Sequence, residues 1–159
     1  TYSFVHKLGI SVVRYFTVFG PCGRPDMSVF RFIKCIDEGK PIDVYGDGTQ
    51  SRDFTYIDDV VSGTIAALKE VGYEIINIGG GNPSTTLKTM ISWIEELLGK
   101  QASIEFHPIS KTDMMSTWAD IRKAESLLGW KPKTTVKEGL ELTVEWHREN
   151  SDWLREVEL

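Results

Sequence analysis

The stretch on which the fold depends is GDGTQSRDFTYIDDV, residues 46–60. Glycines on both sides of Asp47 predict a turn, because glycine adopts positive φ and the aspartate side chain bonds to nearby backbone. Residues 52–57 then alternate polar and apolar, which is typical of a half-buried strand. Asp58 or Asp59 is expected to cap the helix that follows. A turn, a strand and a helix in succession predict a rigid corner.

Arg52 is the basic residue inside this corner. It lies between a polar loop and the predicted strand, so its backbone should be well fixed. A guanidinium held in this way can bind a phosphate through two parallel hydrogen bonds. An edge-strand arginine paired with Asp53 or Asp58 fits the spacing equally well. The residues alone therefore leave two interpretations open.

The bulk properties of the chain exclude several classes of function. Its 159 residues, 41% of them hydrophobic, are enough for one domain with a core. The net charge of -5 argues against nucleic acid as a partner, and no apolar run is long enough to span a membrane. Cys22 and Cys35 are expected to be free thiols, which favours a cytoplasmic location. The three histidines form no cluster, so we expect no metal site.

Strands and helices alternate along the rest of the chain, which favours the α/β class. Ile10–Phe16 and Tyr73–Ile78 are apolar enough for buried parallel strands. Shorter strands are expected at 42–45 and 103–107. Helices are expected over 28–38, over 58–71, from Thr85 or Thr86 to Leu98, from Asp120 to Leu128, and from Thr135, which forms a capping box with Glu138.

Two long strands cannot build a doubly wound sheet alone. Thr1–Leu8 also has the pattern of the end of a helix without an N-cap. We therefore expect the first half of a larger protein to be missing. The glycines of 79–83 lack the spacing of a phosphate loop and predict a tight turn. His107 is expected at a strand end, and His147 is expected to be structural.

Six short motifs occur in an order and spacing that are typical of one known protein family. They are RYFTVFGP (14–21), YGDG (45–48), RDFTYIDDV (52–60), NIG (77–79), ADI (119–121) and LLGWKP (127–132). Together they resemble the C-terminal half of the extended short-chain dehydrogenase/reductase family, the NAD-dependent sugar-nucleotide epimerases and dehydratases. The resemblance covers essentially all 159 residues.

The resemblance implies a truncated Rossmann-like fragment plus a smaller mixed α/β sugar-nucleotide-binding domain. Residues 1–20 and 58–82 would be remnants of the dinucleotide-binding domain, and residues 21–57 and 83–159 would form the sugar-nucleotide-binding domain. The family's glycine-rich dinucleotide loop and its Tyr-x-x-x-Lys pair do not occur in these residues. We therefore expect no catalytic residue here, an inactive fragment, and NAD bound only in the full-length parent.

The resemblance also implies roles for individual residues. Tyr15, Phe16, Thr17 and Val18 would bind the cofactor, next to the nicotinamide ring. Val44 and Tyr45 would bracket the uracil through backbone groups. The substrate-binding set is Thr17, Arg24, Val44, Tyr45, Gln50, Arg52, Lys111 and Asp113. Within it Arg52 would hold the diphosphate, and Lys111 would be a weaker substitute for a second arginine that relatives place nearby.

Thr17 followed by GRPDM (23–27) resembles the UDP-glucuronate 4-epimerase group. A uronic acid carries a carboxylate, to which Thr17 can donate a hydroxyl hydrogen while Arg24 supplies charge. A UDP-glucose 4-epimerase, a 4,6-dehydratase, a uronate decarboxylase and a non-catalytic nucleotide-sugar-binding module remain alternatives. The expected partners are a UDP-sugar and a second copy of the chain, through a homodimer or self-association at exposed sheet edges.

Overall fold

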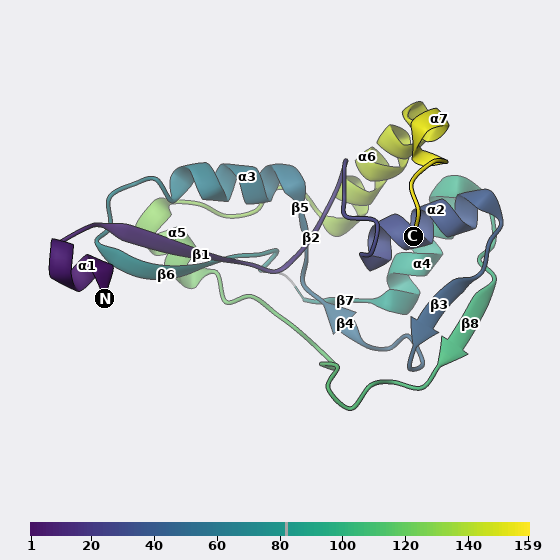
Figure 1. Cartoon of the computed structure of the whole chain (residues 1–159), viewed down its shortest axis with the longest axis horizontal. Helices are drawn as coiled ribbons and strands as arrows, with labels where there is room; N and C mark the ends of the chain where they lie inside the picture. Colours follow the sequence, from purple (N-terminus) through teal and green to yellow (C-terminus); the bar gives the residue numbers. More distant parts are fainter. Residues whose placement is uncertain (82) are drawn as a thin grey trace.

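The structure is a computed structural model that describes residues 1–81 and 83–159, so Asn82 of the predicted glycine turn lies outside the described residues. A narrow arm projects from a larger lobe (Figure 1). The arm comprises α1 (Tyr2–His6), β1 (Ile10–Tyr15), α3 (Ile57–Ala66), β6 (Tyr73–Ile78) and α5 (Arg122–Leu128). The lobe comprises α2 (Ser28–Glu38), β3 (Ile42–Tyr45), α4 (Leu87–Leu98), β8 (Ile104–His107), α6 (Val136–Glu149) and α7 (Ser151–Leu154).

The described strands form four two-stranded sheets. β1 pairs in parallel with β6, from Ile10 opposite Tyr73 to Tyr15 opposite Ile78, and β3 pairs in parallel with β8. Between arm and lobe lie β2 (Thr17–Phe19), β4 (Ser51–Arg52), β5 (Phe54–Tyr56) and β7 (Thr85–Thr86). β2 and β5 are parallel, and β4 and β7 are antiparallel. The predicted α/β class is confirmed.

The predicted strand over 52–57 is wrong in its details, since the chain changes partner at Asp53. β4 pairs with β7 before this residue, and β5 pairs with β2 after it. The helix that follows begins at Ile57, one residue earlier than predicted, and ends at Ala66 rather than at residue 71. By contrast, the capping box of Thr135 and Glu138 is confirmed.

The larger hydrophobic cluster lies where three helices meet β3 and β5. α2, α4 and α6 each contribute an apolar stripe, with Ile33, Ile94 and Leu140 almost fully buried. Burial of such side chains stabilises the lobe by roughly 1.5–3 kcal/mol each. Gly139 allows α6 to approach closely, because a Cβ there would lie 2.8 Å from the Tyr56 ring.

A smaller cluster holds the arm together. Ile76 and Ile78 of β6 pack against Ala124 of α5 and against Trp130. The indole Nε1 of Trp130 donates a hydrogen bond to Ser62 Oγ at 2.9 Å, which connects the segment after α5 to α3. The division of the chain into two domains stays a prediction.

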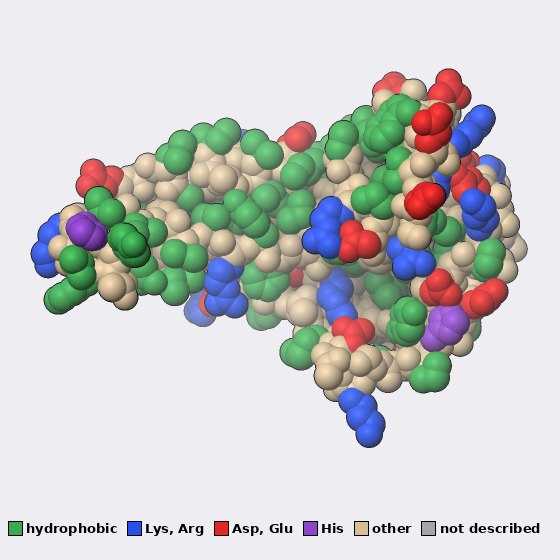
Figure 2. Space-filling view, viewed as in Figure 1, with side chains coloured by type: hydrophobic (Ala, Val, Ile, Leu, Met, Phe, Trp, Pro, Cys, Tyr) green, Lys and Arg blue, Asp and Glu red, His purple; other side chains and the backbone are tan. Residues whose placement is uncertain are grey.

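Apolar side chains also lie on the surface of the arm. Figure 2 shows hydrophobic atoms spread along it. Exposed members include Val12 and Tyr15 of β1, Ile75 of β6, and Ile65 of α3. In the described part of the chain, no helix has both the length and the apolar character needed to cross a membrane.

The Asp53 carboxylate joins segments that are distant in sequence. Its side chain is 2% exposed and accepts backbone hydrogen bonds from Gly80 at 2.6 Å, Gly81 at 3.3 Å and Ala119 at 2.8 Å. Burial raises the pKa of Asp53, while the three backbone donors act in the opposite direction. Position 80 must be glycine here, because a Cβ would collide with Asp53 Oδ1.

Asp59 has a related role at the other end of the corner. Its carboxylate is buried and accepts backbone hydrogen bonds from Lys133 at 3.0 Å and Thr134 at 2.9 Å. The predicted cap of α3 by Asp58 or Asp59 is wrong. Tyr56 is the N-cap without a side-chain bond, and Asp59 turns inward instead. The reason is that two unpaired backbone donors from the approach to α6 need an acceptor.

Replacing Asp53 with asparagine should destabilise the chain. The amide group of asparagine would direct N–H donors towards backbone N–H groups, leaving buried donors unpaired. We expect Asp53→Asn to lower the free energy of unfolding by about 2–4 kcal/mol, measured by urea unfolding. Asp120→Asn is the matched control, since the Asp120 carboxylate lies at the surface and bonds to Arg122. Equal urea midpoints for wild type and Asp53→Asn would contradict this role.

The stability of the lobe should depend on the protonation of His147. This residue is buried on α6, 3.6 Å from Asp37 Oδ2, and burial lowers its pKa although Asp37 opposes the shift. Since the folded pKa lies below the usual value of about 6.5, the unfolded chain binds more protons there. The contribution of neutral His147 to the free energy of unfolding is therefore complete above a pH of about 6.5, and it is lost as the pH falls through the folded pKa. Between pH 7.5 and pH 5.5, the free energy of unfolding from urea titrations should fall more for wild type than for His147→Gln. Equal decreases in the two proteins would refute this role of His147.

Candidate functional site

A cleft of about 280 Å³ opens beside Arg52, between β4, β3 and α2. We call it the Arg52 cleft. Its walls come from five segments that are distant in sequence. It is lined by Thr17, Asp26, Met27, Ser28, Arg31, Phe32, Asp43, Tyr45, Gln50, Arg52, Leu87 and Asp113. Five of the eight predicted substrate residues therefore share one cleft: Thr17, Tyr45, Gln50, Arg52 and Asp113.

Arg52 is held by two contacts within this cleft. Its Nη2 donates to Asp113 Oδ1 at 2.7 Å, and its Nη1 donates to the Ser51 carbonyl at 2.9 Å. The side chain is 19% exposed, so the guanidinium can reach a ligand in the cleft. The pairing with Asp53 or Asp58 that the spacing allowed does not occur, because Asp53 is already bonded to backbone amides.

The predicted turn before Arg52 shapes the floor of the cleft. Gly46 and Gly48 have φ angles of 83° and 78°, and Asp47 Oδ1 accepts from Thr49 N at 2.9 Å. This local bonding lowers the pKa of Asp47. Gln50 folds back under the turn and donates its amide hydrogen to the Tyr45 carbonyl. The turn thereby fixes the backbone of Tyr45.

Gln50 and Tyr45 present unequal groups to the cleft. The Gln50 side chain is 2% exposed, and its Oε1 has no hydrogen-bond partner among the described residues. The Tyr45 ring is exposed and lies 5.2 Å from the His107 ring, between centroids. The exposed aromatic face of Tyr45 suits a planar ligand such as a nucleobase, whereas Gln50 Oε1 is buried beneath the surface of the cleft.

Three predicted substrate residues, Val44, Lys111 and Arg24, are not among the residues that line the Arg52 cleft. Val44 is 1% exposed and packs into the core, so only its backbone, paired with Phe106 across β3 and β8, lies near Tyr45. Lys111 is exposed on the segment after β8, outside the set of lining residues.

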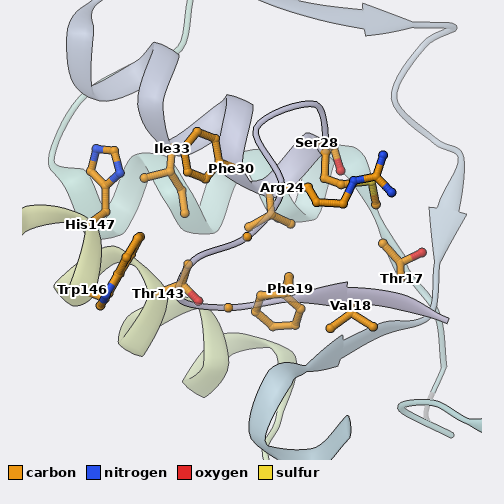
Figure 3. A pocket seen from close by; sticks show the side chains of 14 residues that line it. Thr17, Val18, Phe19, Arg24, Ser28, Phe30, Ile33, Thr143, Trp146 and His147 are labelled. Atoms are coloured by element: carbon orange, nitrogen blue, oxygen red, sulfur yellow. The ribbon is translucent and has the colours of Figure 1, made fainter. Parts of the chain in front are cut away.

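Arg24 lies on the loop after β2, apart from Arg52. Its side chain is 74% exposed and forms an ion pair with Asp26, with Nε at 3.0 Å from Oδ1 and Nη2 at 2.5 Å from Oδ2. This pairing raises the pKa of Arg24. Arg24 lines a narrow hollow together with Thr17 and Val18 (Figure 3). Thr17 lines both this hollow and the Arg52 cleft, so the two share a wall.

The four predicted cofactor residues point in different directions. Phe16 and Val18 line an apolar hollow of about 340 Å³ together with Cys22 and Ile57. Thr17 faces the Arg52 cleft. Tyr15 is exposed, and its hydroxyl lies 3.0 Å from Thr64 Oγ1 on α3.

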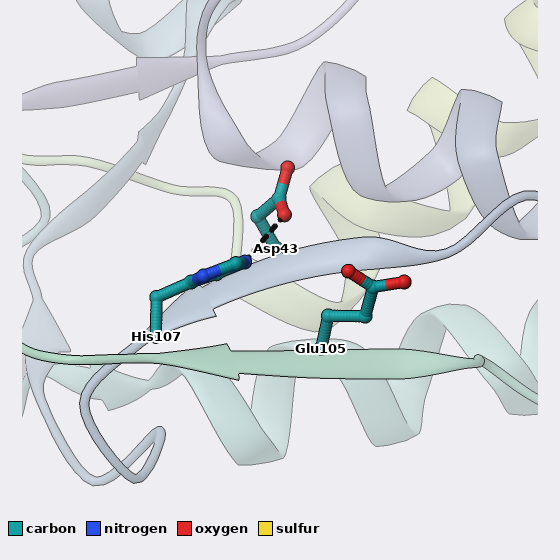
Figure 4. A group of neighbouring side chains, drawn as sticks. All are labelled: Asp43, Glu105 and His107. Carbon is teal, nitrogen blue, oxygen red and sulfur yellow. Dashed lines mark hydrogen bonds and ion pairs between the residues drawn. The ribbon is translucent and has the colours of Figure 1, made fainter.

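Asp43, Glu105 and His107 form a group with metal-type side chains on one face of β3 and β8 (Figure 4). Their ligand atoms lie within 4.8 Å of one another, and His107 Nε2 is 2.7 Å from Asp43 Oδ1. Arg31 donates to the other oxygen, Asp43 Oδ2, at 3.2 Å. A guanidinium so close opposes the binding of a metal cation, so we interpret the group as support for Arg31.

Sequence reasoning missed Arg31, Asp26 and Asp43 in the Arg52 cleft. Asp43 alternates with the apolar residues of its predicted strand, which indicates an outward side chain but not its neighbours. Arg31 lies on the predicted helix over 28–38, yet the sequence pattern does not show what the polar side of this helix contacts. Their membership of the cleft depends on tertiary packing.

Comparisons with known proteins identify a family. The model of the NAD dependent epimerase/dehydratase family matches residues 2–79. UDP-glucuronate 4-epimerase of Thermodesulfobacterium geofontis is 54% identical over 159 residues, which is 100% of this chain and 49% of that relative. The chain spans about half the length of the curated relatives it matches.

The chain is also similar to solved structures of epimerases. UDP-glucuronic acid 4-epimerase from Bacillus cereus, in complex with UDP-glucuronic acid and NAD, is 41% identical with a TM-score of 0.86, and the match covers 94% of this chain and 48% of that one. UDP-glucose 4-epimerase from Thermotoga maritima with UDP-glucose is 32% identical with a TM-score of 0.88, covering 95% and 50%. The chain therefore belongs to the NAD dependent epimerase/dehydratase family.

Proposed function

We propose that this chain forms the substrate-binding half of an NAD-dependent nucleotide-sugar 4-epimerase that acts on UDP-glucuronate. The observation that carries the proposal is the Arg52 cleft, which brings Thr17, Tyr45, Gln50 and Arg52 together from separate segments. In it the exposed Tyr45 ring would face the uracil, the buried Gln50 would fix the Tyr45 backbone, and Arg52 would bind the diphosphate. The complexes of relatives with UDP-glucuronic acid and with UDP-glucose support this class of ligand.

The preference for a uronate rests on Thr17 and Arg24. Thr17 lies between the Arg52 cleft and the hollow that Arg24 lines. A sugar that extends from a diphosphate at Arg52 past Thr17 would bring a C6 carboxylate towards Arg24. Oxidation at C4 of a uronate gives a β-keto acid, which loses CO2 readily when its carboxylate is perpendicular to the ketone. Hydrogen bonds from Thr17 and Arg24 would hold the carboxylate away from that geometry.

The residues present fit part of an NAD site. The apolar hollow bordered by Phe16, Val18 and Ile57 suits the flat nicotinamide ring. When bound, NAD supplies the hydride acceptor for C4 of the sugar. The contribution of this chain would be to place the sugar against that ring and to exclude water from its apolar wall.

The nucleotide preference of the chain tests this function directly. We expect isothermal titration calorimetry with the 159-residue chain to show tighter binding of UDP-glucuronate than of ADP-glucose. Equal affinities would refute a uridine site. In the full-length parent, turnover of UDP-glucuronate in the presence of NAD, followed by chromatography, would separate an enzyme from a non-catalytic nucleotide-sugar-binding module. Loss of CO2 or of water would favour a decarboxylase or a dehydratase instead.

Arg52 and Arg24 should affect different substrates. Arg52→Ala should weaken UDP-glucuronate and UDP-glucose alike by on the order of 10–100-fold, because both carry the diphosphate. Arg24→Ala should weaken UDP-glucuronate by about tenfold and leave UDP-glucose nearly unchanged, since UDP-glucose lacks the carboxylate. For each variant, calorimetry gives the ratio of the dissociation constants for UDP-glucuronate and UDP-glucose. A change in this ratio in Arg24→Ala but not in Arg52→Ala would support the two separate roles.

Arg122→Ala is the matched control for both variants. Arg122 is exposed and pairs with the neighbouring Asp120, as Arg24 pairs with Asp26, but it lies on α5 in the arm. The Arg122→Ala variant should bind UDP-glucuronate and UDP-glucose with the affinities of wild type. If Arg24→Ala weakened both substrates equally, Arg24 would be a phosphate-binding or structural residue and the case for a uronate would fail.

A further inference from the structure

Arg31 places a second guanidinium in the Arg52 cleft. It belongs to α2, whereas Arg52 belongs to β4, so the two side chains enter the cleft from different walls. The Arg31 side chain is 38% exposed, which leaves it accessible to a ligand. The segment 107–116, where the family resemblance implies a second phosphate-binding arginine, contains Lys111 and no arginine.

Arg31 has more unused donors than Arg52. Among the described residues, the Arg31 side chain makes one hydrogen bond, the 3.2 Å contact from Nη2 to Asp43 Oδ2. A guanidinium has five N–H donors, so most of them are available. Arg52 already uses both terminal nitrogens, one of them in a 2.7 Å contact with Asp113. Arg31 is thus the less committed of the two cations.

Asp43 holds Arg31 in place without enclosing it. One oxygen of Asp43 contacts His107 Nε2 at 2.7 Å, and the other contacts Arg31 (Figure 4 shows the first). The carboxylate is therefore fixed on β3 by a partner on β8. A guanidinium held from one side by a fixed carboxylate keeps its remaining edge directed elsewhere, which reduces the ordering cost of binding an anion.

We propose that Arg31, rather than Lys111, supplies the second positive charge that binds the diphosphate. The inference rests on the proposed function, because it assumes a nucleoside diphosphate in the Arg52 cleft. Two phosphate groups carry separate negative charges, and two guanidinium groups from different walls match them better than one. Lys111 is exposed outside the lining of the cleft, so it would have to move to take this role.

Calorimetry with three uracil ligands tests the proposal: UDP, UMP and uridine. We expect Arg31→Gln to weaken UDP by about tenfold, to weaken UMP less and to leave uridine unchanged. Arg31→Lys should recover part of the UDP affinity, since the charge remains but the planar fork is lost. Lys111→Gln should bind all three ligands like wild type. Arg122→Gln, outside the cleft, is the matched arginine control.

The outcomes separate this inference from the function beneath it. If Arg52→Gln weakens UDP while Arg31→Gln does not, Arg31 is not a phosphate ligand and the proposed function stands. A larger loss for Lys111→Gln than for Arg31→Gln would also overturn the inference. An equal loss of UDP and uridine affinity in Arg31→Gln would show a structural role. If wild type binds neither UDP nor uridine, the proposed function fails and the role of Arg31 fails with it.

Discussion

One buried carboxylate determines how the rest of this structure is arranged. Asp53 accepts backbone hydrogen bonds from the turn at Gly80 and from Ala119, 27 and 66 residues further along the chain. Because its side chain is turned inward, the strand changes partners at this point. Arg52 before it faces the cleft, and Phe54 after it enters the core. The hydrogen bonds of Asp53 therefore fix the backbone of both the Arg52 cleft and the core.

The local features of the fold could be predicted from the sequence. The turn at Asp47, the capping box of Thr135 and Glu138, and the helix over 28–38 all follow from contacts within a few residues, and the structure contains them. Such features need only propensity and spacing. They set the lengths and order of the elements, which is enough to define the α/β class.

Features that depend on distant contacts could not be predicted in the same way. Asp59 has the pattern of a helix cap, yet it bonds to Lys133 and Thr134, more than 70 residues away. Arg52 could be placed at a corner, but its partner Asp113 lies 61 residues further along. Arg31 could not be connected with the cleft at all, because the polar side of a helix carries no record of what packs beside it. The resemblance to a family named Asp113 as a substrate-binding residue, but it gave neither the pairing of Asp113 with Arg52 nor the place of Arg31.

The close fit between Gly80 and Asp53 has a consequence for how the sequence can change. A side chain at position 80 would meet an oxygen that backbone amides already hold, so neither partner can move aside. Loss of the acid at position 53 would in turn leave those amides unpaired, whatever occupies position 80. Single substitutions at either position should therefore destabilise the chain, and a second substitution at the other position would not restore the lost hydrogen bonds. Within the family we expect both residues to be retained rather than exchanged, so that this contact limits how the corner can evolve.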